Sequence, residues 1–179
     1  MSKIILFAVA VALILFGRLE ISRASEEPSS EQRVKATASG PAQAVGGKSF
    51  DLIVSLEVQQ GYHIQANTAK DPYIPTTIAV TAPAGLKVGA ASFPTAKTEE
   101  FFGEKLKVFD GKIAVKVPVV APPATKGKQE FSIKVGYQAC NQSACDPPAF
   151  VSTACDVILT SASASPTPRK PSAKKAPHK

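Results

Sequence analysis

The chain has 179 residues, a length typical of one domain with tails, and its formal net charge is +7. The basic excess lies at the two ends, because residues 161–179 contribute +5 and residues 1–24 contribute +2, which leaves the part between them neutral. This distribution excludes a typical nucleic-acid-binding domain, in which positive charge clusters on a folded face.

The first 24 residues have the pattern of an export signal. Lys3 supplies a positive charge near the start, and an apolar run follows from Ile4 to Phe16. In Ser22-Arg23-Ala24, the small residues Ser22 and Ala24 stand at the two positions that a signal peptidase reads. A helix that spans a membrane needs about 20 apolar residues, so a cleaved signal is preferred over a retained anchor. We therefore expect an exported protein.

A polar linker over residues 25–33 leads to the predicted domain, residues 34–160. Apolar and polar side chains alternate with period two through this domain, which is typical of strands with one buried face. Turn signals such as Gly46-Gly47 and Asp110-Gly111 separate the runs, and no helical stripe of three turns follows the signal. The candidate strands are residues 34–38, 50–58, 76–82, 86–91, 105–109, 113–119, 131–137 and 151–159. Seven or eight such strands predict an all-β fold, an immunoglobulin-like antiparallel β-sandwich.

Three cysteines, Cys140, Cys145 and Cys155, lie in the second half of the domain. Export places them where disulfides form and persist. A bond between the first two closes a very short loop, which stabilises a fold less than a long one, so the spacing weakly favours a redox role. From the residues alone, a redox pair and a structural disulfide stand as equal hypotheses. We expect Cys155, in a predicted strand, to be a buried small apolar residue.

Strand alternation also predicts where the cysteine pair lies. If Phe131 and Tyr137 face the core, regular alternation places Cys140 on the opposite face at a strand end, with Cys145 near the surface. A β-bulge would reverse this assignment. Asp146 adjoins Cys145 and no His or Arg is close in sequence, so the local sequence disfavours a reactive thiolate.

Other chemistry has weaker support in the sequence. One CxxxxC pair with only His63 and His178 does not supply the four ligands of a zinc site, and the CxxCH motif of c-type haem is missing. We therefore predict no metal and no cofactor. A hydrolytic enzyme has little support, because there is no nucleophile elbow, paired-histidine metal motif or phosphate loop.

The end of the chain, residues 161–179, reads SASASPTPRKPSAKKAPHK. It has no large apolar residue and four prolines, so it cannot bury enough surface to fold and predicts a disordered basic tail. Its charge suits contact with an anionic surface of the cell envelope, although a simple solubilising role is preferred.

Three segments, taken in order, resemble one known family. GYHIQANTAKDPYIPTT (residues 61–77) resembles its strand and loop G-[WFY]-H-I-x-x-N followed by I-P-T, and EEFFGEKLKVFDG (residues 99–111) resembles its acidic–aromatic–Gly loop. VGYQACNQSACDPP (residues 135–148) resembles its redox motif, two cysteines before a Pro-Pro pair. The family is the amino-terminal periplasmic domain of the thiol:disulfide interchange protein DsbD, and the resemblance covers most of residues 34–160.

The resemblance implies an immunoglobulin-like sandwich that carries a reversible dithiol. By position, Cys145 matches the cysteine that forms mixed disulfides with partners, and Cys140 matches its resolving partner. Phe101 matches the aromatic residue of a cap loop that covers the disulfide and moves aside for a partner. The other residues of the expected cap loop are Glu99, Glu100, Phe102 and Gly103, and the expected neighbours of the site are Tyr62, His63 and Tyr137. Considered as a residue on its own, His63 is expected to be a strand residue with a satisfied hydrogen bond rather than a catalytic base.

The resemblance also implies partners. Electrons would come from a membrane thiol carrier of the DsbD/CcdA kind through a thioredoxin-like protein, and would pass to a periplasmic disulfide isomerase or to cytochrome c maturation proteins. DsbD continues into membrane and thioredoxin-like domains, so for this sequence we expect a separately encoded donor. The leading hypothesis is a periplasmic thiol:disulfide oxidoreductase-like relay. The alternative is an exported immunoglobulin-like binding module in which Cys140–Cys145 is a structural disulfide.

Overall fold

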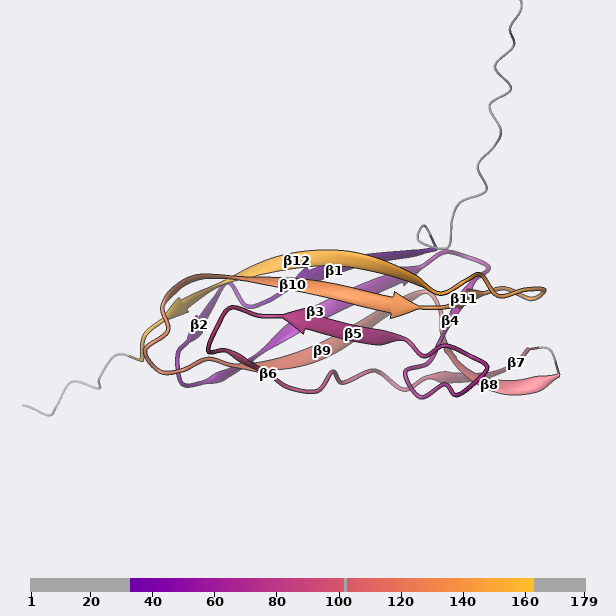
Figure 1. Ribbon diagram of the computed structural model, residues 1–179, viewed down its shortest axis with the longest axis horizontal. Helices are drawn as coiled ribbons and strands as arrows, with labels where there is room; N and C mark the ends of the chain where they lie inside the picture. Colours follow the sequence, from indigo (N-terminus) through magenta and orange to yellow (C-terminus); the bar gives the residue numbers. More distant parts are fainter. Residues whose placement is uncertain (1–32, 102, 163–179) are drawn as a thin grey trace, which may run out of the picture.

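The computed structural model describes residues 33–101 and 103–162, and these form strands joined by turns and loops. Two four-stranded sheets face each other in an immunoglobulin-like β-sandwich (Figure 1). The first sheet has the order β1 (Val34–Ser39), β3 (Ser49–Val58), β9 (Lys112–Val120) and β6 (Lys87–Val88). The second has the order β2 (Gln43–Val45), β12 (Ala149–Thr160), β10 (Gly127–Tyr137) and β5 (Thr77–Thr81). Neighbouring strands are antiparallel except for β2 and β12, which run parallel.

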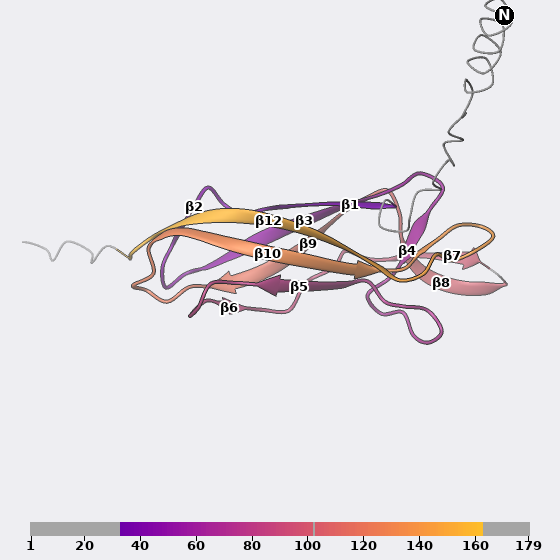
Figure 2. The same ribbon diagram turned by 45° about the horizontal axis from the view of Figure 1, so that its top comes forward.

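A third, smaller sheet lies at one end of the sandwich, at the right in Figure 1 and again in Figure 2. Its order is β11 (Ala139–Cys140), β4 (His63–Gln65), β8 (Glu104–Phe109) and β7 (Lys97–Phe101). The described chain ends after β12 at the opposite end of the sandwich (Figure 1). The small sheet therefore forms a distinct end face, and it contains Cys140.

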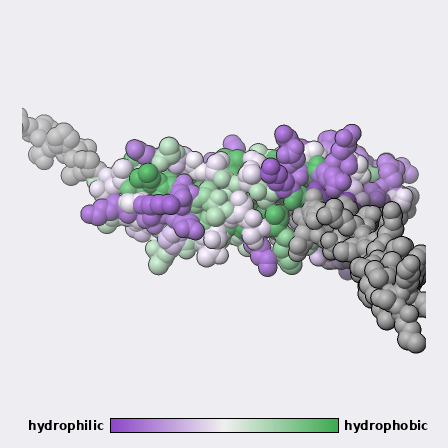
Figure 3. Space-filling model, turned by 90° about the horizontal axis from the view of Figure 1, so that it is seen from above, coloured by the Kyte–Doolittle hydropathy of each residue, from purple (hydrophilic) through white to green (hydrophobic). Residues whose placement is uncertain are grey.

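Alternate side chains from both large sheets fill the core, as the period-two pattern requires. In β3 the residues Leu52, Val54 and Leu56 are buried, and in β10 Phe131 and Ile133 are buried. Burial of one such side chain contributes about 1.5–3 kcal/mol, so these alternating rows hold the two sheets together. Seen from above, hydrophilic side chains are interspersed with small apolar patches on the outer surface (Figure 3).

The predicted fold class and the long strands are confirmed, but the expected number of strands is wrong. The described residues form twelve strands rather than seven or eight, because β2, β4 and β11 carry too few residues to show alternation and the first four residues of β7 are all polar. The expected strand at 86–91 shrinks to the two residues of β6, although Gly89 and Ser92 still hydrogen-bond to the backbone of β9.

Several expectations fall on residues that the structure does not describe. These are the predicted signal at 1–24, the linker up to residue 32, Phe102 and the tail from residue 163. Within the described ranges, no helix is long and apolar enough to cross a membrane.

Candidate redox site

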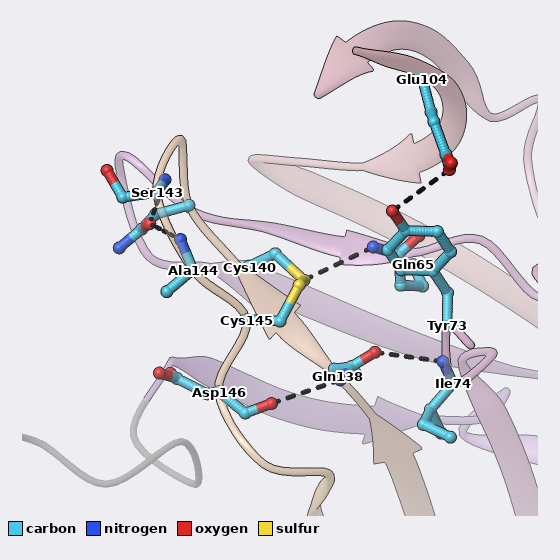
Figure 4. Close-up of a disulfide and its surroundings, with 11 residues drawn as sticks. Gln65, Tyr73, Ile74, Glu104, Gln138, Cys140, Ser143, Ala144, Cys145 and Asp146 are labelled. Atoms are coloured by element: carbon cyan, nitrogen blue, oxygen red, sulfur yellow. Dashed lines mark hydrogen bonds between the residues drawn. A yellow bond between two sulfur atoms is a disulfide. The ribbon is translucent and has the colours of Figure 1, made fainter. Parts of the chain in front are cut away.

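A disulfide joins Cys140 and Cys145, with a distance of 2.05 Å between the two Sγ atoms. Cys140 ends β11, and a tight turn over residues 141–144 returns the chain to Cys145 (Figure 4). The Asn141 side chain stabilises this turn, because its Oδ1 accepts hydrogen bonds from the backbone N–H groups of Ser143 (2.8 Å) and Ala144 (2.9 Å). The turn thus holds the two sulfur atoms together through local hydrogen bonds.

The two cysteines differ in exposure. Cys140 is 0% exposed, whereas Cys145 is only half-buried. Cys140 is not part of the buried hydrophobic cluster of the sandwich, whereas Tyr137 and Ala139 are, so alternation continues and Cys140 lies off the core face as predicted. Its complete burial was not expected. Cys140 is buried in the small end sheet, where it pairs with His63 and accepts a hydrogen bond from Gln65.

Gln65 is the polar side chain that contacts the buried sulfur. Its Nε2 donates a hydrogen bond to Cys140 Sγ at 3.5 Å, and Gln65 itself is only 1% exposed (Figure 4). The backbone N–H of Gln65 also donates to the carbonyl of Gln138, and Thr76 donates its hydroxyl to the Gln65 carbonyl. The amide is therefore fixed against the sulfur, and a thiolate there would accept a stronger hydrogen bond than the neutral disulfide does.

His63 and Phe101 form a stack beside the cysteine pair. His63 is the cross-strand partner of Cys140 where β4 pairs with β11. The ring of Phe101, at the end of β7, lies 3.9 Å from the His63 ring between centroids, with 26° between their planes. Both residues are buried. The structure therefore places Phe101 over the direct neighbour of Cys140.

The expected cap loop is the end of the β7–β8 hairpin. Glu99 is half-buried and Glu100 is exposed in β7, and Gly103 turns the chain with a φ of 79°. A positive φ is costly for residues with a Cβ atom, so glycine suits this tight turn. Phe102 lies outside the described residues.

One ring nitrogen of His63 lacks the hydrogen bond that was expected. Its Nε2 is buried and has no hydrogen-bond partner among the described residues. Burial lowers the pKa of His63 below its usual value of 6.5, and the nearby carboxylates of Glu99 and Asp110 offset part of that effect. The imidazole is therefore neutral near pH 7, and an uncharged ring stacks against Phe101.

A cleft of about 580 Å³ lies between this stack and the turn that joins the cysteines, since Gln142 of the turn lines it. The two stacked rings form part of its wall, and Glu99 and Asp110 contribute carboxylates. Lys97 also lines the cleft, but its ammonium group pairs with Asp110. The cleft thus has an aromatic wall with acidic groups, and it reaches the turn between the cysteines at Gln142, although neither cysteine lines it.

Arg33 reaches the site from the start of the described chain, although the sequence placed it in a linker. Its Nε donates to Asp146 Oδ2 at 3.1 Å, and its guanidinium carbon lies 4.1 Å from the centroid of the Tyr62 ring. The sequence predicted an isolated carboxylate beside Cys145 with no Arg close by along the chain. The fold brings in a cation across 113 residues, so Asp146 is paired.

The remaining predicted residues are two tyrosines and the third cysteine. Tyr137 is 1% exposed at the end of β10, and Tyr62 is half-buried beneath Arg33. Cys155 is a free thiol in β12, half-buried rather than fully buried. It lies six residues along β12 from Ala149, roughly 20 Å at the usual strand rise, so it belongs to a different part of the sandwich.

In the described parts of the chain, no group of three or more His, Cys, Asp or Glu side chains is arranged to hold a metal ion. Among the site residues, Gln65 and Arg33 are those that sequence reasoning missed. Gln65 stands two residues after His63, and that spacing places both on one face of a strand, so its position was a usable signal. No local signal could have assigned Arg33.

Comparison with known proteins gives one family match. The family model described as thiol:disulfide interchange protein DsbD, N-terminal, matches residues 31–153. No curated protein sequence matches the chain.

Three solved structures are similar in fold. The Neisseria meningitidis DsbD N-terminal domain in the reduced form is 22% identical, covers 73% of this chain and 90% of its own, and has a TM-score of 0.43. The N-terminal periplasmic domain of ScsB from Proteus mirabilis is 9% identical, with coverage of 68% and 43% and a TM-score of 0.47. A complex between the DsbD N-terminal and PilB N-terminal domains of Neisseria meningitidis is 15% identical, with coverage of 72% and 87% and a TM-score of 0.44.

Proposed function

The chain belongs to the family of the N-terminal domain of the thiol:disulfide interchange protein DsbD, and we propose that it relays electrons in the periplasm through a reversible Cys140–Cys145 disulfide. One observation carries the proposal. The disulfide joins the half-buried Cys145 to the fully buried Cys140, whose sulfur already accepts a hydrogen bond from Gln65. Such an asymmetric pair has one atom for a partner to attack and one atom suited to leave.

The chemistry follows from this asymmetry. A thiolate of a reduced partner attacks Cys145 Sγ, the S–S bond breaks, and its electron pair goes to Cys140 Sγ, where the Gln65 N–H group stabilises the charge. A second thiolate of the partner then attacks its own sulfur in the mixed disulfide and releases Cys145 as a thiolate. The partner leaves oxidised, and the domain has gained two electrons as a dithiol. The reverse sequence reduces an acceptor.

The cap assigned by the resemblance fits this scheme as part of the proposal. A disulfide that any periplasmic thiol could reach would exchange without selectivity. Phe101, stacked on His63, would have to move before a partner approached along the cleft. Proteins able to displace this ring would react, and small thiols would react slowly.

The proposed partners and location follow from the family and from the export pattern. The donor would be a thioredoxin-like protein or a membrane thiol carrier of the DsbD/CcdA kind, and the acceptor a periplasmic disulfide isomerase or a cytochrome c maturation protein. We propose that residues 1–24 are removed on export, that residues 34–160 form the working domain, and that the tail at 161–179 is a solubilising segment.

A second function, an exported binding module held by a structural disulfide, is favoured by one observation, the complete burial of Cys140. The reduction potential separates the two functions. A structural disulfide has a potential below about −300 mV, and a relay has a higher one. Reduction of a structural disulfide would also destabilise the domain by ~1–3 kcal/mol and lower its melting temperature by several degrees.

A trapping experiment tests the relay directly. Replacement of Cys140 by Ser removes the thiol that would resolve a mixed disulfide at Cys145. This variant should therefore accumulate mixed disulfides with proteins of a periplasmic extract. The matched control, Cys145→Ser, keeps only the buried thiol of the pair and should trap far less. The relay would be excluded if the folded Cys140→Ser variant captured no more protein than the control.

A further inference from the structure

Arg33 is a buried cation with a specific set of partners. Only 8% of the residue is exposed, and a charged side chain so buried requires compensation. Besides Asp146, it donates from one terminal nitrogen to Gln59 Oε1 at 3.2 Å, and the backbone N–H of Gln59 donates back to the Arg33 carbonyl at 2.8 Å. Its guanidinium lies over the Tyr62 ring. The side chain is therefore held by three contacts and the backbone by a fourth, so the position of the charge is fixed.

Asp146, the ion-pair partner, follows Cys145 directly in the chain. Its backbone N–H donates to the Ala139 carbonyl at 2.8 Å, and its carbonyl accepts from Gln138 Nε2 at 3.4 Å (Figure 4). These bonds fix the backbone of Asp146, the residue that follows the half-buried Cys145. An unpaired carboxylate on this neighbouring residue would oppose a negative sulfur, since nearby like charges disfavour each other.

We propose that Arg33 is a positioning residue for thiol exchange, which by pairing with Asp146 removes the negative charge that would otherwise oppose a thiolate at Cys145. This inference rests on the proposed function, because Cys145 must carry a negative charge whenever it attacks a partner or is released from one. Arg33 acts through Asp146 rather than by contact with the sulfur. The pair also joins the residue just before β1 to the segment after the cysteines.

The test measures Cys145 as the sole thiol, in the exported chain that carries Cys140→Ser and Cys155→Ser. The rate of alkylation by iodoacetamide is followed from pH 5 to pH 10, because this rate reports the thiolate fraction. Arg33→Gln leaves Asp146 unpaired and should slow alkylation at pH 7 by about tenfold, which is the effect of one uncompensated charge nearby. The pH profile should move upward by a matching amount.

Two further variants separate charge from structure. The double variant Arg33→Gln with Asp146→Asn removes both charges and should return the rate to within about threefold of the unsubstituted protein. Arg33→Lys keeps the charge and should also recover most of the rate. The proposal is overturned if Arg33→Gln has the unsubstituted pH profile, or if the double variant stays as slow as Arg33→Gln.

Failure to fold does not remove the test. If Arg33→Gln does not fold, Asp146→Asn alone leaves the Arg33 cation unpaired beside the site and should speed alkylation at pH 7 at least threefold, whereas an unchanged or slower rate overturns the proposal. Failure of the relay itself would give a different result. In that case Cys140→Ser traps no partner although the alkylation rates still follow the charge at Arg33 and Asp146.

Discussion

The hydrogen bond from Gln65 to Cys140 Sγ makes a quantitative prediction about the buried thiol. Gln65→Met keeps the volume and shape of the side chain but removes the donor. A hydrogen bond to a charged group contributes about 1.5–3 kcal/mol, and the bond to the neutral disulfide, at 3.5 Å, contributes less. The difference, about 1–2 kcal/mol, should raise the pKa of the Cys140 thiol by about one unit. Above that pKa, it should lower the reduction potential by roughly 20–40 mV.

The assay isolates one sulfur at a time. In a chain with Cys145→Ser and Cys155→Ser, Cys140 is the sole thiol, and its ionisation is followed by thiolate absorbance against pH. The potential is measured on the chain with both cysteines by equilibration with a glutathione buffer. Gln138→Met is the matched control, because the Gln138 amide bonds to the Ile74 N–H and the Asp146 carbonyl rather than to sulfur. Equal Cys140 pKa values in Gln65→Met and in the unsubstituted protein would refute the reasoning.

Three further predictions concern the surroundings of the disulfide. Phe101→Ala should speed reduction by a small dithiol about tenfold in stopped-flow measurements, whereas Phe150→Ala, at a side chain that is 54% exposed on β12, should not. Well above pH 6.5, His63 is neutral in both the folded and the unfolded chain. As the pH is lowered through that value, the unfolded chain binds the proton first, because burial lowers the pKa of His63 in the fold. The free energy of unfolding should therefore decrease as the pH is lowered, and it should decrease less in His63→Gln. Thermal unfolding from pH 5 to pH 7.5 measures the stability of the unsubstituted protein and of His63→Gln. The prediction would be contradicted if their stabilities changed in parallel with pH. Cys155→Ser should leave trapping and potential unchanged, since this thiol lies elsewhere on β12.

The strands that the sequence predicts well are the long ones. Residues 50–58 and 131–137 alternate over enough positions to define a buried face, and the structure gives β3 and β10 at these places. Of the small end sheet, β8 was predicted at residues 105–109, but β4 and β11 were missed because they have three and two residues, too few for a period to appear. The site lies in this small sheet, so the part of the fold that carries the chemistry is also the part that local pattern describes least.

The cysteine pair could be found from its spacing and from the resemblance, but its environment could not. Alternation places Cys140 off the core face, but it does not reveal that a small end sheet with His63 and Gln65 buries this residue. The contact of Gln65 with Cys140 spans 75 residues, and that of Arg33 with Asp146 spans 113. Contacts at such separations are set by the packing of the sheets, which is a property of the whole domain.

The two sulfur atoms meet different kinds of polar partner, and this difference gives them different roles. Cys140 is buried and touches a neutral donor, so it can hold negative charge without a nearby cation and without access to water. Cys145 is half-buried, and the next residue in the chain carries a carboxylate that an arginine neutralises, so a negative charge on Cys145 meets less repulsion. Exchange of Gln65 for an acidic residue, or removal of Arg33, would place an uncompensated negative charge beside one sulfur. Each change should therefore slow a different half of the exchange, release from Cys140 in the first case and attack by Cys145 in the second.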